Sequence, residues 1–210
     1  MTDPARTRIS RPLRTVFLDR DGVINEKMPE GRYVTKPDEL HLLEGAAEAI
    51  ARLNRAGLRV VVASNQRGVA LGLYTTADVD AIHAEMVRRL GDRGAQVDGI
   101  FFCPHDKNEC NCRKPLPGLF EQAAAEFPDI TAATSVMIGD SLSDIEFGKR
   151  VGMKTVFIEG APERRKAGGD KAAAMADLRF GSLAEAAESL LVLQGSDDAA
   201  AADGSAVEGR

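Results

Sequence analysis

Short apolar runs alternate with helical patterns along most of this chain, and this alternation is the feature that most restricts its fold. The runs carry β-forming residues at consecutive positions rather than at every second one, as Val60–Ala63 does. A strand of this kind is buried on both faces, and its regular alternation with helices predicts an α/β fold with a parallel, helix-covered sheet. The expected strands are Thr15–Leu18, Val60–Ala63, Ile100–Cys103, Ser135–Ile138 and Thr155–Ile158.

Four further stretches show apolar residues at the three-and-four spacing of a buried helix face. Local signals mark their ends, because Thr76 can cap the second stretch and Pro128 ends the third. Ser182 and Glu185 can form a capping box for the last one. The four expected helices cover residues 46–53, 79–90, 119–127 and 183–191.

The 210 residues suit one domain of ordinary size. Residues 1–13 are expected to form a flexible arm. Residues 195–210 have Val207 as their only sizeable apolar side chain, too little to offset the entropy of ordering them, so a disordered acidic tail is expected there. The folded domain is therefore expected over residues 14–194.

Charge and hydropathy argue against nucleic-acid and membrane partners for this protein. With 27 Lys+Arg against 32 Asp+Glu, the net charge is −5, which argues against a nucleic-acid footprint but leaves room for a small phosphorylated ligand in a local cationic pocket. Uninterrupted apolar runs are far shorter than the ~20 residues that span a bilayer, and the first residues lack the apolar segment of a secretory signal. A cytoplasmic monomer without membrane or nucleic-acid partners is expected.

Ligands of parallel sheets bind at the carboxyl ends of the strands, so the residues that follow each strand are candidates for a site. Asp19 and Asp21 follow the first strand, and positions two apart on an extended chain point the same way, so the two carboxylates can converge. Gly22 permits the sharp turn that follows. Two such acids suit a divalent cation or a nucleophile with a partner acid, whereas a solvated turn is the alternative.

Two more strand ends carry polar residues. Ser64 and Asn65 begin a glycine-containing turn whose hydroxyl, amides and backbone N–H groups could hold a phosphate, although a plain polar loop has the same composition. Asp140 leaves another strand and Asp144 follows about one helical turn later, so both could face one cation. Capping of a helix by Asp140 or Ser141 is the alternative.

Three thiols and one imidazole fall within ten residues, at Cys103, His105, Cys110 and Cys112. Four such ligands can close a tetrahedral shell, and a closed shell of three cysteines and one histidine is the structural kind of zinc site. Disulfide frameworks place cysteines in distant pairs instead, and a coincidental cluster is the remaining alternative. The basic pair Arg113–Lys114 follows at once and could hold two anionic groups or lie solvated on the surface.

These four motifs, in this order and each at an expected strand end, resemble those of the haloacid dehalogenase (HAD) superfamily of phosphatases over about residues 16–159. The block from Cys103 to Pro115 resembles the zinc-loop branch of that superfamily, which contains heptose 1,7-bisphosphate 7-phosphatases and histidinol-phosphate phosphatases. The resemblance implies a single Rossmann-like α/β domain of HAD type, with three layers, no separate cap domain and a zinc-stapled loop.

The same resemblance implies roles for individual residues. Asp19 would be the nucleophile that forms an aspartyl phosphate, and Asp21 would be the general acid and base. Ser64 and Lys114 would bind the transferring phosphoryl group, and Asn65 and Arg113 the rest of the substrate. Catalytic Mg²⁺ would be held by Asp19, the backbone carbonyl of Asp21 and Asp140, with Asp144 in support. Structural Zn²⁺ would be held by Cys103, His105, Cys110 and Cys112.

The implied activity is a Mg²⁺-dependent phosphoric monoester hydrolase. The favoured substrate is D-glycero-D-manno-heptose 1,7-bisphosphate, losing its C7 phosphate in the biosynthesis of nucleotide-activated heptose, because Leu116-Pro117-Gly118 resembles the heptose group. The short spacing between His105 and Cys110, and Ser141 in place of a frequent lysine, point toward the alternative, histidinol phosphate. A catalytically silent, zinc-stabilised binding protein is the third hypothesis.

Overall fold

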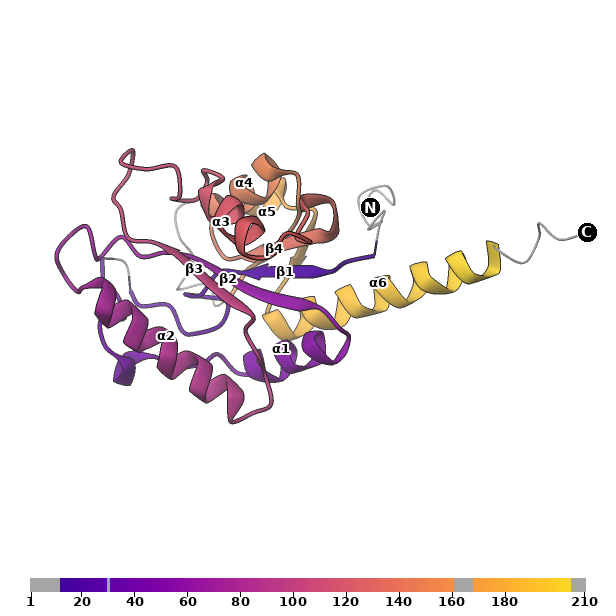
Figure 1. Cartoon of the computed structure of the whole chain (residues 1–210), viewed down its shortest axis with the longest axis horizontal. Coiled ribbons are helices and arrows are strands. Elements are labelled where there is room, and N and C mark those ends of the chain that lie inside the picture. The colour runs from indigo at the N-terminus through magenta and orange to yellow at the C-terminus, as the bar shows by residue number, and fades with distance from the viewer. Residues whose placement is uncertain (1–11, 30, 161–167, 205–210) are drawn as a thin grey trace, which may run out of the picture.

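The computed structural model describes residues 12–29, 31–160 and 168–204, with side chains as far as residue 194. Within these residues, six strands form one parallel sheet in the order β3-β2-β1-β4-β5-β6 (Figure 1). The strands are β1 Thr15–Leu18, β2 Arg59–Asn65, β3 Gly99–Cys103, β4 Ser135–Gly139, β5 Lys154–Ile158 and β6 Leu178–Phe180. The helices are α1 Ala46–Arg55, α2 Thr76–Gly91, α3 Gly118–Glu126, α4 Leu142–Val151, α5 Gly169–Met175 and α6 Leu183–Gly204, with 3₁₀ turns at Pro37–Glu39 and Ala132–Thr134.

The helices form two layers on opposite faces of the sheet, which confirms the predicted three-layer α/β fold. Helices α1, α2 and α6 cover one face and α3, α4 and α5 the other (Figure 1). Val16 and Leu18 of β1 point into the first layer, whereas Phe17 points into the second. All three side chains are fully buried, as expected for a strand with helices on both faces.

Strand β1 lies in the middle of the sheet, between β2 and β4. The chain runs from β1 outward to β2 and β3, and then returns to the other side of β1 to form β4, β5 and β6. The order of strands therefore reverses at β1. A crevice opens at the carboxyl ends of the strands where such a reversal occurs, and this is where ligands bind in open parallel sheets. The topology thus places the end of β1 at the centre of a binding edge.

Helices α4 and α5 and the short strand β6 were absent from the sequence-based expectations. The edge strand β6 has only three residues with an exposed arginine in the middle, and α5 has seven residues, three of them alanine. Neither is long enough to show a period of apolar side chains.

The helix caps also differ in detail. Thr75, not Thr76, caps α2, because its hydroxyl accepts a hydrogen bond from the Asp78 amide. Ser182 caps the amide of Glu185 as expected, but the carboxylate of Glu185 accepts from the amide of Gly181.

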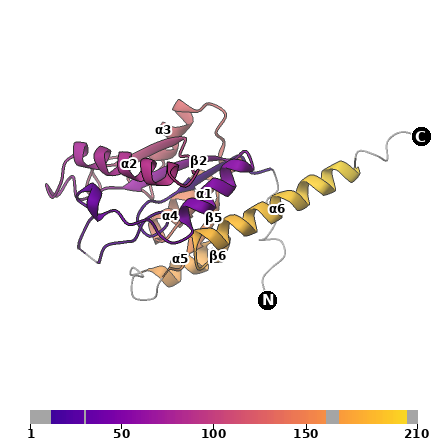
Figure 2. The same cartoon turned by 90° about the horizontal axis from the view of Figure 1, so that it is seen from below.

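Both expected domain ends shift. Leu13 is 3% exposed and joins the core, so the packed chain begins one residue before the expected boundary, while residues 1–11 lie outside the described residues. Helix α6 continues to Gly204, where the sequence predicts a disordered tail from residue 195, and it extends beyond the body of the molecule (Figure 2). Extending a helix that is already nucleated is easy for an alanine-rich stretch, even without an apolar face.

The described residues contain no helix that is both long and apolar enough to cross a bilayer. The cytoplasmic location and the monomeric state stay predictions from the sequence.

The packed half of α6 can be tested with Leu190, which is 1% exposed in the layer formed with α1. We expect Leu190→Ala to lower the free energy of unfolding by about 2–5 kcal/mol, because it removes buried methyl groups and leaves a cavity. Urea denaturation measures the loss. Val192→Ala, at a side chain that is 68% exposed, is the control and should stay within about 0.5 kcal/mol of the unmodified protein. Equal losses would contradict this packing.

Candidate active site

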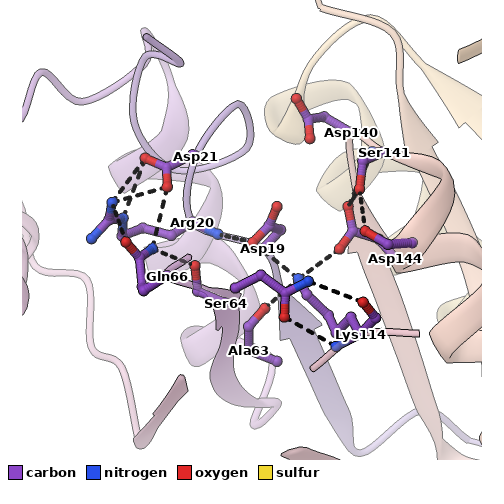
Figure 3. A network of polar contacts seen from close by, with 12 residues as sticks. Asp19, Arg20, Asp21, Ala63, Ser64, Gln66, Lys114, Asp140, Ser141 and Asp144 are labelled. Atoms are coloured by element: carbon purple, nitrogen blue, oxygen red, sulfur yellow. Dashed lines mark hydrogen bonds and ion pairs between the residues drawn. The ribbon is translucent and has the colours of Figure 1, made fainter. Parts of the chain in front are cut away.

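Carboxylates from two strand ends meet at the carboxyl edge of the sheet (Figure 3). Asp19 comes directly after β1, and Asp140 and Asp144 come from the end of β4 and the first turn of α4. One oxygen from each carboxylate lies within 4.8 Å of the others. The structure therefore brings together three of the acids that the sequence singled out, in a group that can hold a divalent cation through oxygen ligands.

Lys114 lies at the centre of this group and is 3% exposed. Its Nζ is 3.0 Å from Asp19 Oδ1 and 2.6 Å from Asp144 Oδ1. It also donates to the carbonyl oxygen of Ala63 at 2.6 Å. Burial by itself would lower the pKa of Lys114, but the charges of Asp144 and Asp19 raise it above its usual value. Lys114 is therefore a buried, permanently charged ammonium group between two carboxylates.

Asn65 orients Lys114 through the backbone. The amide of Lys114 donates to Asn65 Oδ1 at 3.0 Å, and Asn65 Nδ2 donates to the Lys114 carbonyl at 3.1 Å. The side-chain amide of Asn65 thus ties the end of β2 to the loop that carries Lys114. A direct contact between Asn65 and substrate, as the sequence predicts, stays a prediction.

Asp144 serves two purposes at once. Its Oδ2 accepts hydrogen bonds from the amide and hydroxyl of Ser141, at 3.0 and 2.6 Å, and so caps α4, while Oδ1 faces Lys114. Capping of this helix at Ser141, the alternative weighed for this motif, is therefore compatible with Asp144 facing the cation site. A Cβ at Gly139 would overlap the side chain of Asp144, so only glycine permits this close approach.

Lys27 forms an ion pair with Asp140, and both side chains are only 9% exposed. The sequence offered no signal for this contact, because Lys27 belongs to no motif and lies in the long loop between β1 and α1. Gly22 in the same loop has a φ of +92°, and a Cβ there would overlap the carboxylate of Asp140. The loop can pass over Asp140 only because this residue is glycine.

Asp21 does not join the group of Asp19, Asp140 and Asp144. Its carboxylate turns toward Arg20, whose Nη2 lies 2.9 Å from Asp21 Oδ2 (Figure 3). The predicted convergence of Asp19 and Asp21 is thus absent in this arrangement, because hydrogen bonds from Arg20 and Asn25 hold the Asp21 carboxylate on that side. Burial alone would raise the pKa of Asp21, but the charge of Arg20 and the hydrogen bonds that the carboxylate accepts hold the pKa below its usual range.

A network of buried polar side chains supports Arg20, which is 1% exposed. Gln66 Nε2 donates to Asp21 Oδ2 at 3.3 Å and to Ser64 Oγ at 2.8 Å, and its Oε1 accepts from the Tyr74 hydroxyl at 2.9 Å. His83 Nε2 lies 3.4 Å from Arg20 Nη1. Gln66 therefore links Ser64 to Asp21, and sequence reasoning missed this role because Gln66 carries no charge.

His83 and Tyr74 are neutral members of this network. Burial, followed by the positive charge of Arg20, lowers the pKa of His83 to about 3. Burial raises the pKa of Tyr74 to about 12. His83 is thus an uncharged acceptor for Arg20.

The loop from Cys103 to Cys112, called the cysteine loop below, holds a second group of side chains, apart from the carboxylates. His105 Nδ1 lies 3.7 Å from Cys103 Sγ and 3.4 Å from Cys112 Sγ. Cys110 Sγ lies 3.5 Å from Cys103 Sγ and 3.2 Å from Cys112 Sγ. A tetrahedral zinc shell with bonds of ~2.3 Å separates its sulfur ligands by ~3.8 Å. The four donors therefore fit a closed zinc shell with only small adjustments.

Two arginines lie against this loop. Arg113 Nη1 donates to the carbonyl oxygen of His105 at 3.3 Å. Arg67 forms a two-pronged ion pair with Asp106, with Nε at 2.6 Å from Oδ1 and Nη2 at 3.1 Å from Oδ2. Arg113 was expected near the site from the sequence. Arg67 was not, because nothing in the sequence indicates that its loop meets the cysteine loop.

Comparisons with known proteins agree with the fold. Residues 111–186 match the family model described as HAD-hyrolase-like. The parallel sheet, with acids after β1 and β4 and a lysine between them, defines the class as HAD-like hydrolases.

Within this class, the chain is 40% identical over 154 residues to the D-glycero-beta-D-manno-heptose-1,7-bisphosphate 7-phosphatase of Bordetella bronchiseptica, covering 73% of this chain and 84% of the relative. It is 39% identical over 171 residues to the corresponding alpha-heptose enzyme of Mycobacterium tuberculosis, covering 81% and 87%. The crystal structure of the B. bronchiseptica D,D-heptose 1,7-bisphosphate phosphatase, complexed with magnesium and phosphate, has a TM-score of 0.74 at 38% identity and covers 85% of this chain and 98% of its own. The chain belongs to the family of the heptose 1,7-bisphosphate 7-phosphatases.

The neutral state of His83 can be tested by titration. Its pKa in the folded protein lies below the ordinary 6.5, so the unfolded chain takes up the proton first. This contribution to stability is fully present above pH ~6.5 and is lost as the pH falls toward 3. The loss of folding free energy amounts to about 2 kcal/mol at pH 5. NMR should show the His83 ring, identified by its loss in His83→Gln, untitrated at pH 5, and the variant should lack this part of the pH dependence. A pKa near 6.5 for His83 would contradict the assignment.

Proposed function

We propose that this protein is a phosphomonoesterase that removes the C7 phosphate from D-glycero-D-manno-heptose 1,7-bisphosphate. The observation that supports the chemistry best is the buried Lys114 ammonium held between Asp19 and Asp144, beside Asp140. The substrate follows from relatives with that name that are 36–40% identical over most of the chain. Relatives named for the beta and alpha anomers match almost equally well, so the proposal covers both.

Asp19 is positioned to act as the nucleophile. The amide of Arg20 donates to Asp19 Oδ1 at 2.8 Å and Lys114 lies against the same atom, so the carboxylate is held in one orientation. Attack by an Asp19 oxygen forms an O–P bond while the bond between phosphorus and the sugar oxygen breaks. The product is an aspartyl phosphate, and Lys114 balances negative charge on the transferring group.

Asp21 supplies the proton transfers. It gives a proton to the sugar oxygen as that oxygen leaves, and in the second step it takes a proton from the water that attacks the aspartyl phosphate. Release of phosphate then frees the Asp19 carboxylate and leaves Asp21 with the proton taken from water. The contact with Arg20 favours the carboxylate form of Asp21, which activates water, so Asp21 must turn away from Arg20 and take up a proton before it can protonate the sugar oxygen.

The acidic group suits one magnesium ion. Three carboxylates with Lys114 and Lys27 carry one net negative charge, and a divalent cation that replaced Lys27 at Asp140 would balance the two charges then left. Asp19, the backbone carbonyl of Asp21 and Asp140 would hold Mg²⁺, with Asp144 in support. When bound, Mg²⁺ neutralises charge on the phosphoryl oxygens. The related B. bronchiseptica structure contains magnesium and phosphate.

The cysteine group suits a structural zinc ion. Cys103, His105, Cys110 and Cys112 fill all four positions of a tetrahedral shell, which leaves none for substrate. A zinc ion here would fix the loop that leads directly into Arg113 and Lys114. The zinc site would thereby keep the phosphate-binding Lys114 at a fixed position beside Asp19.

The catalytic proposal predicts that the purified protein with Mg²⁺ releases phosphate from heptose 1,7-bisphosphate and leaves the C1 phosphate in place. Asp19→Asn should lower kcat by at least ~1000-fold, because the amide cannot form the covalent intermediate. Asp38→Asn makes the same chemical change at an exposed carboxylate and should leave activity unchanged. Colorimetric phosphate release gives the rates, and ³¹P NMR identifies the remaining phosphate.

Full activity of Asp19→Asn would contradict the mechanism. A higher kcat/KM for histidinol phosphate than for the bisphosphate would keep the mechanism and overturn the substrate. Activity on neither compound would overturn the proposed function.

The zinc proposal predicts about one equivalent of zinc in protein purified without added metal. Cys110→Ser should lower this stoichiometry and the melting temperature, because one of four ligands is lost and the loop is no longer pinned. Glu109→Gln, at the neighbouring residue, should change neither value. Elemental analysis and calorimetric unfolding measure both quantities. Metal-free protein with an unchanged melting temperature in Cys110→Ser would contradict a zinc site.

A further inference from the structure

The ion pair between Arg67 and Asp106 joins two loops at the carboxyl edge of the sheet. Arg67 follows β2, three residues after Ser64, and Asp106 belongs to the cysteine loop. The ion pair is bidentate, because Arg67 Nε lies 2.6 Å from Asp106 Oδ1 and Nη2 lies 3.1 Å from Oδ2. The side chains are 37% and 27% exposed, so the pair is accessible from solvent.

A second arginine reaches the same short segment. Arg113 Nη1 bonds to the carbonyl oxygen of His105, the residue just before Asp106. Both arginines lie close to Asp106, because Arg67 binds its carboxylate and Arg113 binds the preceding carbonyl oxygen. Two cations from different loops therefore flank one carboxylate, and this group carries a net positive charge.

Each arginine is connected along the chain to the catalytic residues. Arg113 immediately precedes Lys114, whose ammonium group lies 3.0 Å from Asp19. Arg67 immediately follows Gln66, which bonds to Ser64 and Asp21. The two arginines thus lie next to the catalytic residues on the same edge of the sheet. A bisphosphate attacked at Asp19 carries a second, unreacting phosphate that needs a cationic partner on this edge.

We infer that Arg67 is a specificity-determining residue that binds the unreacting phosphate together with Arg113, and that Asp106 holds Arg67 in place until substrate arrives. Carboxylate and phosphate oxygens both fit the two-pronged face of a guanidinium group, so one anion can replace the other. An ion pair this exposed adds little to stability, so its exchange for a phosphate is easy. The inference rests on the proposed function, because it requires a substrate with two phosphates.

The inference predicts opposite effects for the two partners. Arg67→Gln removes a phosphate ligand and should raise KM for heptose 1,7-bisphosphate at least about tenfold with little change in kcat. Asp106→Asn removes the competing carboxylate and should lower that KM. Neither change should alter kcat/KM for p-nitrophenyl phosphate, which has no second phosphate. Steady-state kinetics with both substrates measures these values.

Arg59 and Asp129 provide a matched control, because they form an ion pair at 2.8 Å with side chains 26% and 60% exposed. Arg59 begins β2 at the opposite edge of the sheet. Arg59→Gln and Asp129→Asn should leave the kinetics with both substrates unchanged.

Two results would overturn the inference alone. If Arg67→Gln and Asp106→Asn both weakened activity on both substrates, the pair would only fasten the cysteine loop. If neither altered KM for the bisphosphate, Arg67 would not contact the second phosphate. Failure of the unmodified protein to hydrolyse the bisphosphate, with p-nitrophenyl phosphate still cleaved, would instead overturn the proposed function and the inference with it.

Discussion

The buried ammonium group of Lys114 is the interaction on which the rest of the site depends. It contacts Asp19 after β1, the carbonyl of Ala63 in β2 and Asp144 in α4, so one side chain joins three elements that are distant in sequence. A buried charge is costly unless it is paired and hydrogen-bonded. Lys114 and the two carboxylates therefore require one another, and the loop that carries Lys114 must be placed accurately. Asn65 provides that placement on one side, and the cysteine loop that precedes Lys114 provides it on the other.

The sheet supplies the frame for this pairing. Because β1 lies where the strand order reverses, the loops after β1, β2 and β4 meet at the carboxyl edge of the sheet, and the cysteine loop follows β3 at the same edge. The acidic residues lie at the centre of that edge, whereas the arginines Arg67 and Arg113 lie beside the cysteine loop. This separation of negative and positive groups suits a phosphorylated substrate with magnesium at one end and a second anion at the other.

Much of this arrangement could be predicted from the sequence. Consecutive apolar residues in the strands indicated a parallel sheet, and the sheet indicated that Asp19, Asp140 and Asp144 would lie at one edge, whereas the place of Lys114 followed from the resemblance of its motif to the HAD superfamily. The orientation of Asp21 could not be predicted, because it depends on a turn and on the buried side chains of Arg20 and Gln66. The contacts of Lys27 and Arg67 were equally hidden, since each joins loops whose relative positions only the folded chain defines. The helical continuation of α6 to Gly204 was missed because it lacks an apolar period.

Detection of the covalent intermediate tests the central claim most directly. The protein is mixed with heptose 1,7-bisphosphate and Mg²⁺, quenched in acid within the first turnovers, and digested for mass spectrometry. A phosphorylated aspartate at position 19, at a level that rises with substrate and disappears during a chase, is the predicted result. Rapid hydrolysis with no phosphate on Asp19 at any quench time, or with phosphate on another residue, would contradict a mechanism in which the carboxylate beside Lys114 attacks phosphorus.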